Sequence, residues 1–431
     1  MKGAEPSRYL SLVEKMASLL LLTYPTLMLA VKGGMNGAFL LMLMLALAVR
    51  IVRPAGMDKT VWKSEWTIYG VSMVAMSAAI FISQSYHHNY SAHSYDGASR
   101  YWLAIPVFLL LRRLNIEALT VLQAAFPVAA ISGFLLAKNM GEGTGNRSGI
   151  ETLDLIHFGD FELILAMLSL WSISWIGRDG TALKILKICG FLAGVAASFS
   201  SGSRGGWLAI PAFAAIFIYF NAAKSLRLVV SIAAIGTLSG LLLYSFNPTL
   251  HQRINQLTSE VAALDHGNQD TSTGVRWQLY KAAVEIFSHN PIFGVGPDGF
   301  AQEMTPMMEQ GKITPAAAQL GRGEVHSDIL NKAVGMGLFG LAAIIAVYLV
   351  PGWLFWRATK SASAQVKRTG ILGIVFVSGF FISGLTVEIL NLTMAIAFYS
   401  FTVAALLAVC CNIHHETGSS GADSNKDIHH V

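Results

Sequence analysis

Charged residues are scarce in this chain. Only 13% of its 431 residues are charged, whereas 54% are hydrophobic, and the mean hydropathy is +0.54. In an ordinary soluble domain charged residues make up roughly a quarter of the total. This shortage excludes a soluble globular fold and indicates an integral membrane protein.

Cysteine is also scarce, and a pair of closely spaced aspartates is absent. The three cysteines, Cys189, Cys410 and Cys411, fall inside apolar runs, where cysteine behaves as a small buried hydrophobe, so no disulfide framework is expected. The sequence contains no Asp-x-Asp pair, which is the usual carboxylate clamp of metal-dependent nucleotide-sugar enzymes. We therefore expect neither a metal ion nor another cofactor.

Long apolar runs occupy most of the chain. The first, at residues 16–31, follows Lys2, Arg8 and Lys15 as a signal peptide would, but it lacks a small-x-small cleavage site, so we expect an uncleaved first span. The sequence thus predicts an all-α polytopic membrane protein with about twelve transmembrane helices. The further runs lie at about 38–52, 66–83, 98–111, 116–136, 155–176, 184–201, 206–220, 227–245, 329–356, 370–387 and 391–411.

The basic residues predict the topology. Most of the 30 Lys and Arg residues fall in segments that twelve spans place on the same side as the N-terminus. The short loops on the outer side hold only Lys32, Arg100, Lys138, Arg147 and Arg204. The positive-inside rule therefore predicts that both termini are cytoplasmic, and the basic pI reflects topology rather than binding of nucleic acid.

The chain divides into four predicted parts. Residues 1–245 hold spans one to nine, and residues 329–411 hold spans ten to twelve. Between them, residues 246–328 form a large outer loop with helices expected near 248–264, 274–288 and 301–310, and we expect this loop to carry the chemistry. Residues 412–431 are polar and rich in small residues, which predicts a disordered tail.

One arginine stands where arginine is disfavoured. Arg204 lies in the sequence SGSRGG, a short connection between two spans on the outer side. Its planar guanidinium suits phosphate oxygens, and the flanking glycines allow a ligand to approach the backbone. The alternative is an ion pair with a lipid headgroup or a loop carboxylate.

Two further arginines are candidates for binding an anion. Arg276 lies in the first turn of the helix expected near 274–288, where a cation opposes the helix dipole, so its position favours an anionic partner. The alternative is a salt bridge to Asp270, Asp298 or another acid of the loop. Arg322 is a weaker candidate of the same kind.

His326 lies where the outer loop becomes a membrane helix. A position near a helix N-terminus disfavours the charged form of imidazole, as a general base requires. Glu324 or Asp328 could orient the ring. The alternative is that His326 only caps the helix or makes a structural hydrogen bond.

Two other clusters compete for a role. His157, Asp160 and Glu162 open the span at 155–176, and ionisable residues at membrane depth usually face a water-filled cavity. This pattern is weak for a metal site and packing against Arg147 or Lys138 is the simpler reading. The loop 84–96 holds three histidines and three tyrosines. We interpret it first as an interfacial aromatic belt, with a metal site as the more distant alternative.

Taken together, three motifs resemble the O-antigen ligase and polymerase superfamily. These are SSGSRGG before a span, GVRWQLYKAAVEIFSHNPIFGVGPDGF in the outer loop and VHSDILNKAVGMGLFG at the return to the membrane. The resemblance implies transfer of a glycan from an undecaprenyl-diphosphate carrier on the periplasmic side of a bacterial inner membrane. In the ligase branch the acceptor is lipid A-core, and no nucleic acid takes part.

The resemblance also implies roles for single residues. Arg204 and Arg276 would bind the donor diphosphate, and His326 would deprotonate the acceptor hydroxyl in a metal-independent, inverting reaction. Where many relatives carry an aromatic residue and Glu-x-Gly, this chain reads SDILNKAVGMG, so no role of a neighbouring acid carries over. Asp160, Glu162 and Glu324 remain secondary candidates for the base.

Other functions compete with the ligase interpretation. A polymerase of the same fold would extend the glycan on its carrier, and a further option is a ligase that attaches glycans to pilin. A secondary transporter is a more distant alternative, because transporters show duplicated halves and broken helices, whereas polar residues here gather in one outer loop.

Overall fold

The computed structural model describes residues 8–52, 64–140, 147–221, 230, 245, 248–265 and 268–423. Within these ranges the chain is helical and contains no named strand, only an isolated bridge between Ile150 and Leu153. The predicted all-α polytopic fold is therefore confirmed.

The long helices match the apolar runs closely. They are α1 (Arg8–Ala30), α2 (Gly34–Val52), α3 (Ser64–His87), α4 (Ser94–Leu111), α6 (Leu122–Met140), α7 (Leu155–Trp171), α8 (Thr181–Ser201), α10 (Ala209–Asn221), α16 (Asp328–Ala358), α17 (Ala364–Ser383) and α18 (Thr393–Asp423). Short helices connect them, namely α5 (Ile116–Leu119), α9 (Arg204–Trp207) and the 3-10 helix η1 (Ile389–Asn391). The predicted span at 227–245 lies outside the described residues.

Among the described residues, eight helices are long and apolar enough to cross a membrane: Tyr9–Ala30, Gly34–Val52, Ser64–His87, Ile116–Asn139, Thr181–Ser201, Asp328–Ala358, Ala364–Ser383 and Thr393–Cys411. The chain is thus a multi-pass membrane protein. Helices α7, with 17 residues, and α10, with 13, are shorter than the roughly 20 residues of a straight crossing. Twelve crossings therefore remain a prediction.

Helix α18 lies at the centre of the bundle. Of the apolar window of this helix, 89% is buried, and it packs against α4, α17 and α2. A helix that is apolar on all sides is typical of such a central position. In the structure α18 continues to Asp423, whereas the sequence predicts a disordered tail from residue 412. Extending an existing helix avoids the cost of nucleating a new one.

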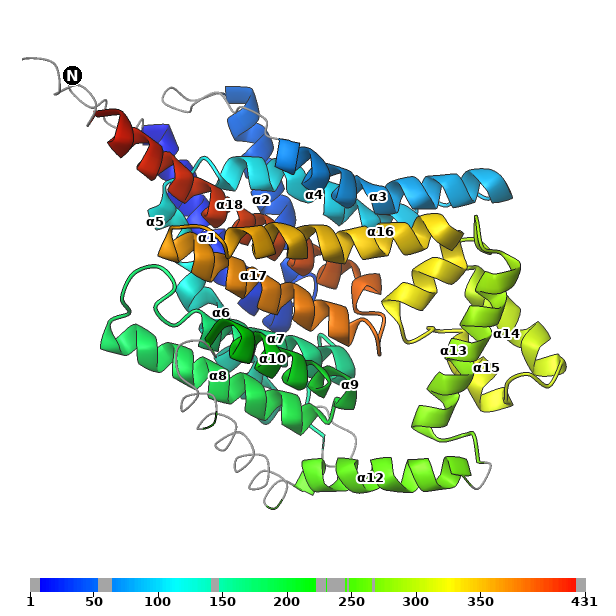
Figure 1. Cartoon of the computed structure of the whole chain (residues 1–431). Helices are drawn as coiled ribbons and strands as arrows, with labels where there is room; N and C mark the ends of the chain where they lie inside the picture. The colour runs from blue at the N-terminus through cyan, green and yellow to red at the C-terminus, as the bar shows by residue number, and fades with distance from the viewer. Residues whose placement is uncertain are drawn as a thin grey trace, which may run out of the picture.

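The outer segment forms a helical group at one end of the bundle (Figure 1). It contains α12 (Pro248–Asp265), α13 (Ser272–His289), α14 (Gly299–Glu309) and α15 (Pro315–Gly321). The first three match the helices expected from the sequence, whereas α15 was not expected. Leu279, Met304 and Ala317 form a small core with Val334, which ties α13, α14 and α15 to the start of α16.

The glycine-rich turn between α13 and α14 fills a kink in α16. Gly337 has φ +60° inside that helix, and the chain there opens to pair with the turn: Leu338 N–H donates to Pro291 O (2.7 Å) and Val295 N–H to Val334 O (2.9 Å). From α3, Ser83 donates to Phe293 O at 2.9 Å. The turn thus anchors the outer helices to the bundle.

The last turn of α3, which holds the first residues of the 84–96 segment, also packs on this turn. His87 Nε2 lies 3.0 Å from Gly294 O, and the ring of Tyr86 stacks on Phe293 at 4.1 Å between centroids. These contacts give at least two of the aromatic side chains of the 84–96 loop a packing role.

Candidate active site

Arg204 lies at the turn between α8 and α9, which packs against α7 and the segment that follows α17. Helix α8 ends at Gly202, whose φ of +67° reverses the chain, and α9 begins after Ser203. A Cβ at Gly205 would collide with the Thr386 hydroxyl, after the end of α17, and one at Gly206 with the carboxylate of Asp160. The two glycines are therefore required by close packing of this turn against its neighbours.

The Arg204 guanidinium is only partly satisfied. Its Nη2 donates to Glu260 of α12 at 3.1 and 3.3 Å, while Nη1 is buried without a hydrogen-bond partner among the described residues. Burial raises the pKa of Glu260, but a 2.6 Å hydrogen bond from Thr273 and the pairing with Arg204 outweigh it and lower the pKa. Glu260 is therefore ionised at neutral pH and holds one side of the guanidinium.

Asp160 and Glu162 face different directions. Asp160 accepts a hydrogen bond from Ser203 Oγ at 2.8 Å, and its Oδ2 is buried without a partner in the described part of the chain. Glu162, two residues further along α7, lies against Gly133 of α6. Only Asp160 therefore borders the Arg204 turn, and the two acids do not act as a pair.

His157 has a structural partner. Its Nδ1 lies 2.5 Å from Oδ2 of Asp154, whose other oxygen caps the start of α7. Arg147, one of the two basic residues expected to pack against this cluster, donates from Nε to Ser201 O at 2.6 Å. Within the described ranges, no group of three or more His, Cys, Asp and Glu side chains is arranged to hold a metal ion.

Arg276 is half-buried on α13 and makes no hydrogen bond or ion pair with the described residues. The alternatives considered from the sequence, Asp270 and Asp298, are not its partners. Arg276 lies one helical turn before Tyr280 on α13, so it shares a helix face with the residue whose hydroxyl contacts Leu385 O at 3.1 Å.

His326 is buried and strained. It has φ +63°, a conformation that is uncommon outside glycine, and only 3% of its surface is exposed. Its Nδ1 lies 2.9 Å from Glu324 Oε1, but neither ring nitrogen has a hydrogen-bond partner of good geometry among the described residues. Strain and unsatisfied polar groups of this kind cluster at functional sites.

Tyr280 links the histidine to the arginine turn. Its hydroxyl lies 3.0 Å from His326 O and 3.1 Å from Leu385 O, and Leu385 precedes Thr386, against which Gly205 packs. Burial raises the pKa of this phenol, although Arg276 opposes the shift. Sequence reasoning missed Tyr280, although it lies four residues after Arg276 and so on the same helix face.

Two buried acids hold the start of α16. Asp328 accepts hydrogen bonds from Leu390 N–H at 3.0 and 3.2 Å and from Tyr348 at 2.8 Å. The Asp328 carboxylate is thus bonded to Leu390 and Tyr348 and not to the imidazole of His326, which the sequence suggested it could orient.

Glu388 is the second of these acids and was missed from the sequence. It accepts hydrogen bonds from Val325 N–H and Asn331 Nδ2, on either side of His326. Burial raises the pKa of Glu388, and the charge of Lys332 only partly offsets this. An isolated acid between two apolar spans is a signal that could have identified it.

Arg322 lies apart from the other candidates. It is exposed, and its Nη2 donates to Thr305 Oγ1 of α14 at 3.0 Å. The structure thus brings together Arg204, Arg276, Asp160 and His326 around the 385–386 connection, but not Glu162 or Arg322.

Comparison with known proteins agrees with these motifs. Residues 189–345 match a family described as O-antigen ligase, and this range includes Arg204, Arg276 and His326. An uncharacterized protein of Haemophilus influenzae is 26% identical over 287 residues, which is 65% of this chain and 71% of that protein. An O-antigen ligase of Escherichia coli is 22% identical over 163 residues, 37% of this chain and 38% of the ligase. The resemblance seen in the sequence is thus supported over residues 189–345, where this multi-pass membrane protein matches the O-antigen ligase family.

Proposed function

We propose that this protein transfers an O-antigen glycan from undecaprenyl diphosphate to lipid A-core on the periplasmic face of the bacterial inner membrane. The match to the O-antigen ligase family over residues 189–345 supports an activity of the ligase or polymerase type. The donor, the acceptor and the residue roles given below are part of the proposal.

The proposed reaction needs one base and a site for the leaving group. The acceptor hydroxyl oxygen attacks the anomeric carbon of the donor while the bond from that carbon to the diphosphate oxygen breaks, which inverts the configuration. The hydroxyl proton passes to a neutral His326. Because the lipid diphosphate is already a good leaving group, no acid catalyst is required.

The arginines stabilise the departing diphosphate. Arg276 has no ion pair to break, and Arg204 offers its unsatisfied Nη1 while Glu260 holds Nη2. Guanidinium groups bind phosphate oxygens in a bidentate manner and act best where water is excluded. In this proposal they take the role that a metal ion has in other glycosyltransferases.

One observation carries the proposal. Arg204, Arg276 and His326 come from three separate elements that meet at the 385–386 connection. Gly205, next to Arg204, packs on Thr386, while Tyr280, one turn after Arg276 on α13, contacts both Leu385 O and His326 O. Chain connectivity alone does not require this convergence, and a shared anionic substrate explains it.

The test replaces His326 by asparagine. Asparagine tolerates φ above zero but cannot act as a base, so His326→Asn removes the chemistry without adding strain. We expect transfer to fall by about 10²–10⁴-fold, with binding of undecaprenyl diphosphate measured on the same preparation unchanged. Near-normal transfer, or a parallel loss of carrier binding, would remove His326 from the role of base.

The same assay separates ligase from polymerase. Lipid A-core and a second carrier-linked glycan are offered as acceptors in separate reactions. We expect product only with lipid A-core, and elongation of the carrier-linked glycan would instead identify a polymerase.

A further inference from the structure

A large cavity lies far from His326, at the other end of the bundle. It has a volume of about 1160 Å³ and is bordered by the start of α3, the ends of α4 and α16, the start of α17 and the middle of α18. Helix α16 runs from Asp328, near the candidate active site, to the cavity over 31 residues, so at 1.5 Å per residue the two are separated by roughly the thickness of a membrane. The cavity therefore does not belong to the site described above.

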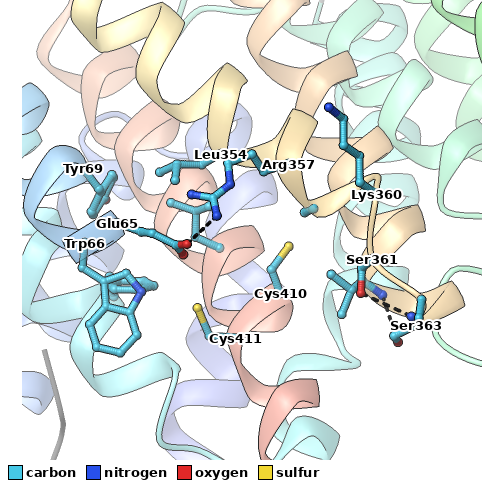
Figure 2. A pocket seen from close by; sticks show the side chains of 15 residues that line it. Glu65, Trp66, Tyr69, Leu354, Arg357, Lys360, Ser361, Ser363, Cys410 and Cys411 are labelled. Carbon is cyan, nitrogen blue, oxygen red and sulfur yellow. Dashed lines mark hydrogen bonds and ion pairs between the residues drawn. The ribbon is translucent and has the colours of Figure 1, made fainter. Parts of the chain in front are cut away.

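The walls of the cavity are apolar and its rim is cationic. Trp66, Tyr69, Phe108 and Leu407 line it, together with Arg357 and Lys360 (Figure 2). Its volume exceeds the range of about 300–1,000 Å³ that is usual for sites of drug-sized molecules. The cavity is thus large enough for an amphipathic molecule with a long apolar part.

Several polar groups at the cavity have unused bonding capacity. Tyr69 is 1% exposed, and its hydroxyl has no hydrogen-bond partner among the described residues. The side-chain amine of Lys360 makes no hydrogen bond or ion pair within the described ranges and lies 5.6 Å from the centre of the Trp356 ring. Beside the cavity, Arg112 lies over the Trp66 ring at 3.7 Å, with Nε and Nη1 lacking hydrogen-bond partners in the described part of the chain.

Arg357 is anchored in a position to bind an anion. Its Nη2 pairs with Glu65 Oε1 at 2.7 Å, with the two side chains 47% and 42% exposed. This ion pair fixes the guanidinium at the rim but leaves a net positive charge, since Lys360 and the neighbouring Arg112 have no acidic partner among the described residues. The site therefore favours a negatively charged headgroup.

We propose that this cavity binds an anionic glycerophospholipid from the membrane leaflet at this end of the protein. Its phosphate would lie between Arg357 and Lys360, the Tyr69 hydroxyl would donate to a lipid oxygen, and an acyl chain would cover Trp66 and Leu407. Basic pockets between transmembrane helices on the cytoplasmic side are known to take anionic lipid headgroups. The proposal does not depend on the glycan transfer proposed above.

The test compares lipids that differ only in the headgroup. The purified full-length protein is incubated with phosphatidylglycerol or with phosphatidylcholine of identical acyl chains, and bound lipid is measured by native mass spectrometry. We expect phosphatidylglycerol to be retained preferentially. Equal retention of both lipids would overturn the proposal.

Matched variants distinguish the cavity from the general lipid belt. A cation near an anionic lipid contributes about 1 kcal/mol, so Lys360→Ala should weaken binding of phosphatidylglycerol about fivefold. Lys367, exposed on α17 and not part of the cavity lining, provides the control Lys367→Ala, which should change nothing. If both variants weaken binding equally, the lipid binds at the surface and not in the cavity.

A second variant avoids any loss of packing. Because no partner of the Tyr69 hydroxyl is lost, Tyr69→Phe should keep the melting temperature of the lipid-free protein and still reduce retention of phosphatidylglycerol. Glycerol 3-phosphate serves as the probe for a soluble anion. Displacement of the lipid by this compound at low concentration would show a phosphate pocket without a lipid subsite and would also contradict the proposal.

Discussion

At the scale of single residues, unsatisfied polar atoms distinguish the candidate site from an ordinary helix contact. Buried polar groups are almost always hydrogen-bonded, because leaving one unpaired costs about 1–3 kcal/mol. Arg204 Nη1, Asp160 Oδ2 and both ring nitrogens of His326 are buried without such partners among the described residues. A diphosphate and an acceptor hydroxyl would satisfy the arginine and the histidine.

The first residue-scale prediction concerns Arg276. Because this side chain has no hydrogen bond or ion pair within the described ranges, Arg276→Ala leaves no group unpaired, and stability should change by less than about 0.5 kcal/mol. Loss of charge-assisted hydrogen bonds to the donor should lower kcat/KM by about 10²-fold, and Arg276→Lys should recover only part of this, since lysine lacks the planar fork.

Arg322 provides the matched control for Arg276. It lies in the same outer segment but is exposed and bonded to Thr305, so Arg322→Ala should keep nearly full transfer. Steady-state kinetics on the three variants decides the matter. Equal losses in Arg276→Ala and Arg322→Ala would show a general effect of charge in the loop and not a diphosphate contact.

The second residue-scale prediction concerns Tyr280 as a positioning residue. Tyr280→Phe removes the hydroxyl that contacts His326 O and Leu385 O, so the backbone that carries the imidazole loses one support. A hydrogen bond contributes about 0.5–1.5 kcal/mol, and we expect kcat to fall about threefold to tenfold with carrier affinity unchanged. A change confined to the affinity for the carrier would instead place the hydroxyl on the donor.

At the scale of elements, the connection between the outer helices and the bundle depends on glycine. Gly294 has φ +68°, and a Cβ there would collide with the backbone of Val334 and Gly335 in α16. The turn that contains Gly294 thus fits into the α16 kink only without a side chain. Since α16 begins two residues after His326, the same contact fixes the direction in which the histidine leaves the outer segment.

A pair of glycine variants separates close packing from backbone strain. Gly311 has nearly the same φ, +70°, but a Cβ there would meet nothing within 4 Å, so Gly311→Ala should lose only the roughly 1–2 kcal/mol of a left-handed residue. Gly294→Ala should lower the melting temperature substantially more, because it adds a backbone collision. Equal shifts in thermal unfolding would show that the turn is not held against α16.

The sequence predicted the helices well and the contacts between distant segments poorly. Hydropathy located α1 to α4, α6 to α8 and α16 to α18, because an apolar run of this length has few alternatives to a helix in lipid. The motifs also predicted Arg204, Arg276 and His326 as site residues, and these roles stay predictions. In contrast, the pairing of Asp328 with Leu390 and of Glu388 with Val325 joins segments that are distant in the chain, and no local pattern reports such contacts. Arg322 was grouped with the site because position in the sequence does not reveal the direction of a side chain.

At the scale of the whole molecule, the candidate active site and the cationic cavity lie at opposite ends of the bundle. Arg112, Arg357 and Lys360 gather at the cavity end, whereas α13, α14 and α15 lie at the other end (Figure 1). His326 lies two residues before Asp328, where α16 begins. Because Lys and Arg are retained on the cytoplasmic side, we predict from this polarity that the cavity faces the cytoplasm and the proposed transfer site faces the periplasm.

Thiol labelling tests this orientation. In a parent with all three native cysteines replaced by alanine, Glu309→Cys places a thiol on exposed α14 and Lys367→Cys places one on exposed α17. With the outer membrane permeabilised and the inner membrane intact, a membrane-impermeant maleimide should label only Glu309→Cys, and lysis should make both reactive. Both positions are exposed, so a difference in labelling reports the side of the membrane and not burial. If Lys367→Cys were labelled while the inner membrane is intact, the topology would be the opposite of the one predicted. The proposed transfer site would then lie in the cytoplasm, where lipid A-core of the outer leaflet could not reach it.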